Sequence, residues 1–474
     1  MADWRVSRIV EQAVLADAGG VFHAGGMTRQ MLLASLLLAA VPATAAAPAP
    51  RHDAAPDPAQ LRQTISTLVG FGTRHTLSTT TDPRRGIGAA RHWVAGRFGE
   101  MGRDCGGCLA VETIGDTFSG PRAPDGVRVE DVIAVQKGTT DPDRVVIVQG
   151  HLDSRVNDVM DATTDAPGAN DDASGVALVM EAARLLSKQK FPATIVYAAL
   201  SGEEQGLWGG KLLATTAKAR GWKVAAVLNN DIVGNTHGIG GEHVADRVRV
   251  FSEGIEIAAD RAGDLKQRAL GGEDDSPSRA LAKAVVRVAA AHKGIGLDVW
   301  AIRRPDRFQR GGDHIPFLEA GFPAVRFSEA TEDYDRQHQR VRVENGRRYG
   351  DVIDFVDFSY LARVTALNVA VLREMASAPA APASAAIAGA LSDDTHVSWA
   401  PVAGASGYRV RWRRADGFAW TDAKDVPATT TAIDLAHVNI DDHFFGVSAL
   451  SADGAESLVT FAGVPPRPAP GTVR

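Results

Sequence analysis

The chain has 474 residues, which is more than one hydrophobic core usually serves, so we expect two domains. Its 45% hydrophobic and 23% charged residues are ordinary for a soluble globular protein, and its net charge of -6 argues against a nucleic-acid binder. No uninterrupted apolar run reaches the roughly 18 residues that a membrane-spanning helix needs.

The N-terminal region has the pattern of a secretory signal peptide. A short basic start at 27–30 precedes an apolar stretch at 31–41, and Ala43-Thr44-Ala45 has the small-x-small form of a cleavage site. We therefore predict a signal peptide at 27–45 and a secreted or periplasmic mature protein. Residues 1–26 look like neither a signal nor a domain, which indicates an upstream extension and a true start at Met27.

The two cysteines, Cys105 and Cys108, are separated by two glycines. In an exported protein this spacing most simply predicts a disulfide that closes a small loop. A redox-active pair of the thioredoxin type and a free dithiol are the alternatives.

Helical and strand patterns alternate over residues 55–375, and this order predicts a three-layer α/β sandwich. The predicted helices span 58–69, 84–101, 173–188, 209–219, 278–292 and 351–375. The predicted strands span 127–136, 145–148, 194–200, 224–228, 249–251 and 324–327, with a glycine-rich loop at 234–244.

The last part of the chain has a different character. An Ala/Pro/Ser stretch at 376–386 is typical of a linker, and short candidate strands follow it at 397–399, 408–412, 431–435 and 444–450. These strands predict an all-β sandwich at 387–463. Trp399, Tyr408 and the 451–454 turn resemble a fibronectin type III domain, which would contact other proteins or surfaces, or serve as an accessory module that binds nothing strongly.

Acidic residues and histidines gather where the predicted strands end. His151 and Asp153 follow the strand at 145–148, and residues two apart on an extended chain point to one face. Further acids and histidines follow later strands or open later helices: Asp171, Asp172, Glu203, Glu204, Asp231, Asp313, His314 and His338. Histidine and carboxylates are ligands that zinc takes from proteins, and open α/β sheets place ligand sites at strand ends.

The local sequences around these residues resemble the secreted bacterial di-zinc aminopeptidases, metallopeptidase family twenty-eight. The matching stretches are, in the family's order, HLDS, PGANDDASG, SGEEQGLWGG, NNDIVGN, GGDHIPF and YDRQHQ. The resemblance covers roughly residues 55 to 375. It implies a zinc exopeptidase fold of the phosphorylase/hydrolase-like type.

The resemblance also implies two zinc ions that share Asp171 and a bridging water. His151 and Asp231 would complete the ligands of one zinc, and Glu204 with a late histidine those of the other. His338 occupies the late position, and His314 is the alternative. Glu203 would be the general base, because a free carboxylate beside a ligating one can take a proton from the water and return it to the leaving amine.

Other residues would support the site without binding metal. Asp153 would accept a hydrogen bond from His151, and Asp172 would follow Asp171 through a cis peptide bond. Asp313 would be a supporting acid or a plain loop acid.

Two further roles are expected at the walls of the site. His314 would steady the wall, and Tyr334 would line the pocket or steady the oxyanion. Arg303, Arg304 and Arg307 are expected to pair with acids rather than bind substrate.

The sequence thus predicts a secreted zinc exopeptidase that removes N-terminal residues from peptides. The alternative within the enzymes is a zinc carboxypeptidase or an amide-deacetylating hydrolase with the same metal pair. The alternative outside the enzymes is a binding protein that acts through its β-domain.

Overall fold

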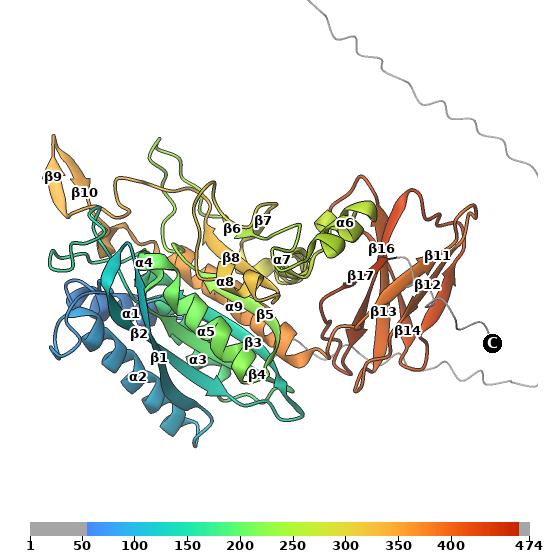
Figure 1. Ribbon diagram of the computed structural model, residues 1–474, viewed down its shortest axis with the longest axis horizontal. Helices are drawn as coiled ribbons and strands as arrows, with labels where there is room; N and C mark the ends of the chain where they lie inside the picture. The colour runs from blue at the N-terminus through green and yellow to red at the C-terminus, as the bar shows by residue number, and fades with distance from the viewer. Residues whose placement is uncertain (1–54, 464–474) are drawn as a thin grey trace, which may run out of the picture. The chain divides into compact units, whose positions relative to one another are not determined.

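The computed structural model describes residues 55–463, which form an α/β domain followed by an all-β domain (Figure 1). The predicted extension at 1–26 and the predicted signal peptide at 27–45 lie outside these residues. Within 55–463, no helix combines the length and the apolar character that a membrane crossing would need.

An eight-stranded mixed sheet is the centre of the α/β domain, in the order β1-β2-β4-β3-β5-β8-β6-β7. Its strands are β1 (Ala110–Gly120), β2 (Ala123–Gln136), β3 (Asp141–His151), β4 (Ala193–Leu200), β5 (Lys223–Asn230), β6 (Arg247–Phe251), β7 (Asp298–Ile302) and β8 (Ala324–Glu329). The four central strands β4, β3, β5 and β8 run parallel to their neighbours among these four. Their carboxyl ends therefore lie at one edge of the sheet.

Helices cover both faces of this sheet. The helices of this domain are α1 (Pro58–Gly70), α2 (Gly86–Asp104), α3 (Ala173–Leu186), α4 (Glu203–Gly206), α5 (Trp208–Ala219), α6 (Arg261–Ala269), α7 (Pro277–Ala291), α8 (Ile315–Glu319) and α9 (Phe358–Ser377). In β3, Val146 and Val148 pack into the core with α1, α2, α3, α7 and α9, whereas Val145 and Ile147 pack with α5 and α8. This alternation with period two gives two buried faces. The predicted three-layer α/β sandwich is thus confirmed.

Side-chain caps explain where two of these helices begin. Ser276 accepts a hydrogen bond from the backbone of Arg279 and Pro277 takes the first helical position, so α7 starts one residue before the predicted 278. The predicted helix at 351–375 is wrong at its start, because α9 begins only at Phe358, after its N-cap Asp357. A separate 3₁₀ turn, η3 (Ile353–Phe355), precedes it.

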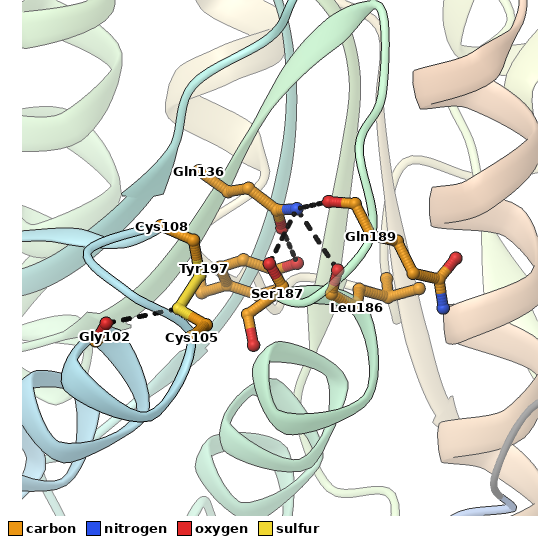
Figure 2. Close-up of a disulfide and its surroundings, with 8 residues drawn as sticks. All are labelled: Gly102, Cys105, Cys108, Gln136, Leu186, Ser187, Gln189 and Tyr197. Atoms are coloured by element: carbon orange, nitrogen blue, oxygen red, sulfur yellow. Dashed lines mark hydrogen bonds between the residues drawn. A yellow bond between two sulfur atoms is a disulfide. The ribbon is translucent and has the colours of Figure 1, made fainter.

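The disulfide between Cys105 and Cys108 is present and lies between the end of α2 and the start of β1 (Figure 2). Near it, the Gln136 side chain donates hydrogen bonds to the carbonyls of Leu186 and Gln189, at 3.1 and 2.7 Å. Gln136 also accepts one from the Tyr197 hydroxyl, at 2.8 Å. These bonds tie the end of α3 to β2, close to the pair of cysteines. The predicted small-loop disulfide is therefore confirmed.

The C-terminal domain is a seven-stranded sheet in the order β14-β13-β16-β17-β11-β12-β15. Its strands are β11 (Ala385–Ala388), β12 (Thr395–Trp399), β13 (Gly407–Arg414), β14 (Asp422–Pro427), β15 (Ala432–Leu435), β16 (His443–Leu450) and β17 (Thr460–Gly463). Because α9 extends to Ser377 and β11 starts at Ala385, the connection is shorter than the predicted linker at 376–386. The likeness to a fibronectin type III domain stays a prediction.

Buried ion pairs join the β-domain to α7. Arg413 of β13 pairs with Asp275, which also pairs with Lys283 of α7. Glu456, whose side chain is fully buried, lies 3.7 Å from Arg287 of α7. Since buried charges must be paired, these residues fix the contact between the two domains.

Candidate metal centre

The carboxyl ends of the four parallel central strands bring the predicted site residues together. His151 is the last residue of β3, and Asp231 follows β5 directly. Glu203 and Glu204 open α4 just after β4, and His338 lies in the connection after β8. Asp171, two residues before α3, completes the set.

Two groups of possible metal ligands share Asp171. In the first, Nε2 of His151 lies 3.2 Å from Oδ1 of Asp171 and 3.9 Å from Oδ1 of Asp231. In the second, Nε2 of His338 lies 2.9 Å from Oδ2 of Asp171 and 2.9 Å from Oε1 of Glu204. Within each group one ligand atom per residue lies within 4.8 Å of the others. The two oxygens of Asp171 therefore face different groups, as a carboxylate that bridges two cations requires.

The donor chemistry fits zinc in both groups. Nε2 of His151 and Oε1 of Glu204 are buried without a well-formed hydrogen bond. Although burial acts against it, the carboxylates of Glu204 and Asp171 raise the pKa of His338 to about 10. These carboxylates thus favour a positive charge beside them. A divalent cation bound by a neutral imidazole would supply that charge, and imidazole with carboxylate is a donor set that zinc accepts.

Glu203 lines the same cavity as these groups. Desolvation of its carboxyl group, with a further contribution from the neighbouring Glu204, raises the pKa of Glu203 well above its usual range. A raised pKa makes this carboxyl group a stronger proton acceptor than an ordinary carboxylate.

Asp153 holds the start of α4 in place. Its carboxylate accepts hydrogen bonds from the Thr76 hydroxyl at 2.8 Å and from the backbone N–H groups of Glu204 and Glu203 at 3.1 and 3.3 Å. The expected bond from His151 differs in detail, since Nδ1 of His151 lies 3.0 Å from the backbone carbonyl of Asp153 and 3.6 Å from its carboxylate. Because the Asp153 carboxylate already accepts hydrogen bonds from α4, the Asp153 carbonyl is the closer acceptor for the His151 imidazole.

Asp172 plays the corresponding part for α3. It caps the helix by accepting from the N–H of Gly175, and it also accepts from the N–H groups of His151 and Ile232, at 2.9, 3.0 and 3.3 Å. A side chain at Gly175 would meet the Asn230 carbonyl at 2.2 Å, so glycine permits this close approach of α3 to β5. The peptide bond between Asp171 and Asp172 is cis, as expected.

The three remaining predicted residues lie around the site rather than in the ligand groups. Asp313 accepts a hydrogen bond from the N–H of Gly210 at 2.9 Å, and burial raises its pKa to about 7. His314 is buried, with Nε2 2.7 Å from the Pro305 carbonyl, and it belongs to neither group. Tyr334 is 54% exposed and does not line the cavity, which leaves the predicted substrate contact without support in the structure.

Two arginines at the site were not predicted from the sequence. Nε of Arg155 lies 2.6 Å from Oε2 of Glu204, and another of its nitrogens lies 2.6 Å from Nδ1 of His338. Arg326, fully buried in β8, lies 2.8 Å from Oδ1 of Asp231 and 3.2 Å from Asp306. For Arg326 the sequence did hold a signal. A charged residue stands within the apolar strand at 324–327, and a buried charge needs a partner.

Asp351 was also missed. Its carboxylate accepts hydrogen bonds from the backbone N–H groups of Asn170 and Asp171, the latter at 2.7 Å. Burial raises the pKa of Asp351 to about 7. The partners lie 180 residues apart along the chain, so no local pattern indicates them.

Glu203 and four of the candidate ligands line a cavity of about 460 Å³; these ligands are Asp171, Glu204, Asp231 and His338. Its other walls come from the turn between β1 and β2, from α4 and from the loop before α8. A cavity of this size at the edge of a parallel sheet suits a small ligand or the end of a chain.

Comparison with known proteins gives consistent matches. The model of "Peptidase family M28" matches residues 131–354. A "Probable zinc metalloprotease" of Pyricularia oryzae is 43% identical over 419 residues, which cover 85% of this chain and 82% of the relative. A protein of Leptosphaeria maculans with the same description is 41% identical, covering 84% of this chain and 92% of the relative. These relatives are fungal, so the expected bacterial origin is not supported by them.

Among solved structures, the LapA aminopeptidase of Legionella pneumophila is similar to this chain. The two share 19% identity with a TM-score of 0.48, over 68% of this chain and 70% of that one.

Proposed function

Because this chain belongs to peptidase family M28, a family of zinc-dependent peptidases, we propose that it is a di-zinc aminopeptidase. It would hydrolyse the N-terminal peptide bond of peptides. The six local motifs, which occur in the order found in the secreted di-zinc aminopeptidases, support this choice, and a zinc carboxypeptidase or an amide-deacetylating hydrolase with the same metal pair is the alternative.

One observation carries the proposal: two groups of ligand atoms share Asp171, and Glu203 lies beside them in the same cavity. One zinc would be held by His151, Asp171 and Asp231, and the other by Asp171, Glu204 and His338. Zinc, when bound, polarises the carbonyl of the scissile bond and makes water more acidic.

Glu203 would then act as general base and general acid. Its carboxylate takes the proton of the attacking water, and the same group returns that proton to the nitrogen that leaves. The raised pKa of Glu203 supports its role as base, because it makes the carboxylate a stronger proton acceptor.

We also propose that the mature protein acts outside the cytoplasm. The predicted signal peptide supports this location, and the disulfide between Cys105 and Cys108 is of a kind that persists in oxidising compartments. N-terminal sequencing of the exported protein should find a start close after Ala45.

The test is one hexapeptide with a free amino terminus, incubated with the zinc-loaded protein and followed by mass spectrometry. Residues lost one by one from the amino end, and none from an acetylated copy, are the expected result. Loss from the carboxyl end would replace the aminopeptidase by a carboxypeptidase. No loss from any of a panel of such peptides would contradict an exopeptidase of either kind.

A further inference from the structure

The cavity at the metal centre is lined by four arginines as well as by acids. The arginines are Arg122, Arg155, Arg307 and Arg310, and the acids are Asp171, Glu203, Glu204 and Asp231. An amino terminus is a cation, so a site that only had to hold one would not need four arginines around it.

The acids of the cavity already have tasks under the proposed function. Three of them are candidate zinc ligands and the fourth is the candidate base. Among the described cavity residues, no further carboxylate remains for a positively charged substrate group. Two zinc ions would carry four positive charges, which offset these four carboxylates, and the charge that remains in the cavity is that of the arginines.

The arginines differ in how far they are already paired. Arg155 is bound to Glu204. Arg307 contacts Asp306 at 3.1 Å and Glu332 at 3.4 Å, so it pairs with acids as expected. Both guanidiniums are thus held by the protein.

Among the described residues, Arg310 pairs with one acid, and it shares that acid with other arginines. Its guanidinium lies 3.0 Å from Glu332, and Glu332 also pairs with Arg307 and Arg249. Although burial acts against it, these three guanidiniums lower the pKa of Glu332 to about 2. Glu332 is thus shared among three guanidiniums, and of the two that line the cavity only Arg307 has Asp306 as a further partner, so Arg310 keeps just part of the charge of one carboxylate.

Arg122 has no acidic partner in the part of the chain that the structure describes. It is exposed in the turn between β1 and β2, and it donates a hydrogen bond of 2.5 Å to the backbone carbonyl of Glu204. This bond holds the guanidinium beside a candidate zinc ligand while leaving its other N–H groups to a ligand.

We propose that Arg122 and Arg310 bind a carboxylate of the peptide substrate and thereby select peptides that carry one near the scissile bond. The inference rests on the proposed function, since it concerns the substrate of the same site. A guanidinium binds a carboxylate through two parallel hydrogen bonds, and the cavity provides two such groups on different loops. The carboxylate has two sources, an aspartate or glutamate side chain or the α-carboxylate of a short peptide.

The experiment compares kcat/KM on matched peptides for the zinc-loaded protein. Glu and Gln are exchanged at the first and at the second position of an amidated tetrapeptide, and a dipeptide with a free carboxylate is compared with its amide. We expect the acidic member of one pair to be preferred about 10-fold or more. The preferred pair identifies the source, a side chain or the α-carboxylate.

The variants are Arg122→Gln and Arg310→Gln, with Arg304→Gln as control. Arg304 belongs to the same loop as Arg310, but its guanidinium lies over the Phe308 ring and not in the cavity lining. Each test variant should lower the acid-to-amide ratio about 10-fold, as the loss of one charge-assisted hydrogen bond predicts. The control should keep the ratio. An equal ratio in the wild type and both test variants would overturn the inference while leaving the peptidase proposal intact.

A binding measurement keeps the inference testable if no peptide is hydrolysed. Calorimetric titration of zinc-loaded Glu203→Gln protein with the Glu and Gln tetrapeptides, and with the dipeptide acid and amide, compares affinities directly. Tighter binding of one acidic member, lost when Arg122→Gln is added, supports the inference even if the proposed hydrolysis fails. Equal affinities in every pair would overturn it.

Discussion

Replacing Glu456 by glutamine tests whether buried charge holds the β-domain and its contact with α7 together. The Glu456 side chain is fully buried, and its carboxylate lies 2.7 Å from Arg411, 2.9 Å from Arg409 and 3.7 Å from Arg287. Although burial acts against it, the hydrogen bond to Arg411 and these positive charges lower the pKa of Glu456 from 4.5 to about 2.

The size of the effect follows from this pKa. A pKa lowered in the folded state stabilises that state above the unfolded pKa of 4.5, and the gain is lost as the pH falls through about 2. At about 1.4 kcal/mol for each pH unit between the two values, the ionised carboxylate contributes on the order of 3 kcal/mol at pH 7. Glutamine resembles the protonated acid, so Glu456→Gln should lose about this amount.

Urea unfolding followed by tryptophan fluorescence, at several pH values between 7 and 3, measures the difference. The free energy of unfolding of Glu456→Gln should lie about 3 kcal/mol below that of the wild type at pH 7, and the gap should narrow as the pH approaches 3. Asp425→Asn is the control, because Asp425 pairs with the same Arg409 but its side chain is 54% exposed. It should cost under about 1 kcal/mol. A free-energy difference between the variant and the wild type that is absent at pH 7, or that is as large at pH 3 as at pH 7, would refute the reasoning.

Three further predictions concern the metal centre. Glu203→Gln should lower kcat by roughly 10²- to 10⁴-fold with unchanged zinc content, and full activity would remove Glu203 from the role of base. His338→Ala should lose one zinc per chain by elemental analysis while His314→Ala keeps both, and the reverse pattern would move the ligand role to His314. Chelation should lower the melting temperature and added zinc should restore it, since zinc at about 100-fold above its Kd stabilises the folded state by about 3 kcal/mol; an unchanged melting temperature would argue against zinc at this site.

From the sequence, most of the candidate ligands could be placed at one edge of the sheet, because they follow or open elements with an apolar pattern. His151 and Asp231 stand at the ends of apolar strands, and parallel strands bring their carboxyl ends to one edge without any further information. The prediction of His338 needed the resemblance as well. Its connection has no periodic pattern of its own, and only the motif order indicated its place.

Several of the elements that were missed have little burial. β1, at one edge of the sheet, has only one buried residue, Ile114. The helix α6 has none, and the small hairpin of β9 (Arg342–Glu344) and β10 (Arg347–Tyr349) is almost wholly exposed. A hydrophobic pattern arises from burial, so elements without burial leave no pattern to detect.

The long-range partners of the site could not be predicted for a different reason. Asp351 binds the backbone beside Asp171, and Arg155 binds His338, across 180 and 183 positions of sequence. The residue types alone show that these charged groups need partners, but only the folded structure shows which residues the partners are.

The acids at this site form two sets, one that faces backbone N–H groups and one that faces the cavity. This division explains how so many carboxylates can lie close together. Asp153, Asp172 and Asp351 point at backbone N–H groups, and each joins the segments that carry candidate ligands. These hydrogen bonds stabilise the charge of the acid and the position of the segment together. The acids that face the cavity lack such bonds on their inner oxygens, so cations must balance them.

Two arginines complete this arrangement by contacting candidate ligands. Arg155 and Arg326 each bind an oxygen of a candidate ligand, Glu204 and Asp231 respectively, which orients the carboxylate before any cation is present. Both guanidiniums are held by these ligands, so the proposed preference for an acidic peptide depends on Arg122 and Arg310, whose charges no candidate ligand offsets. A substrate that brings its own negative charge would offset these two charges, and a neutral substrate would leave them in place.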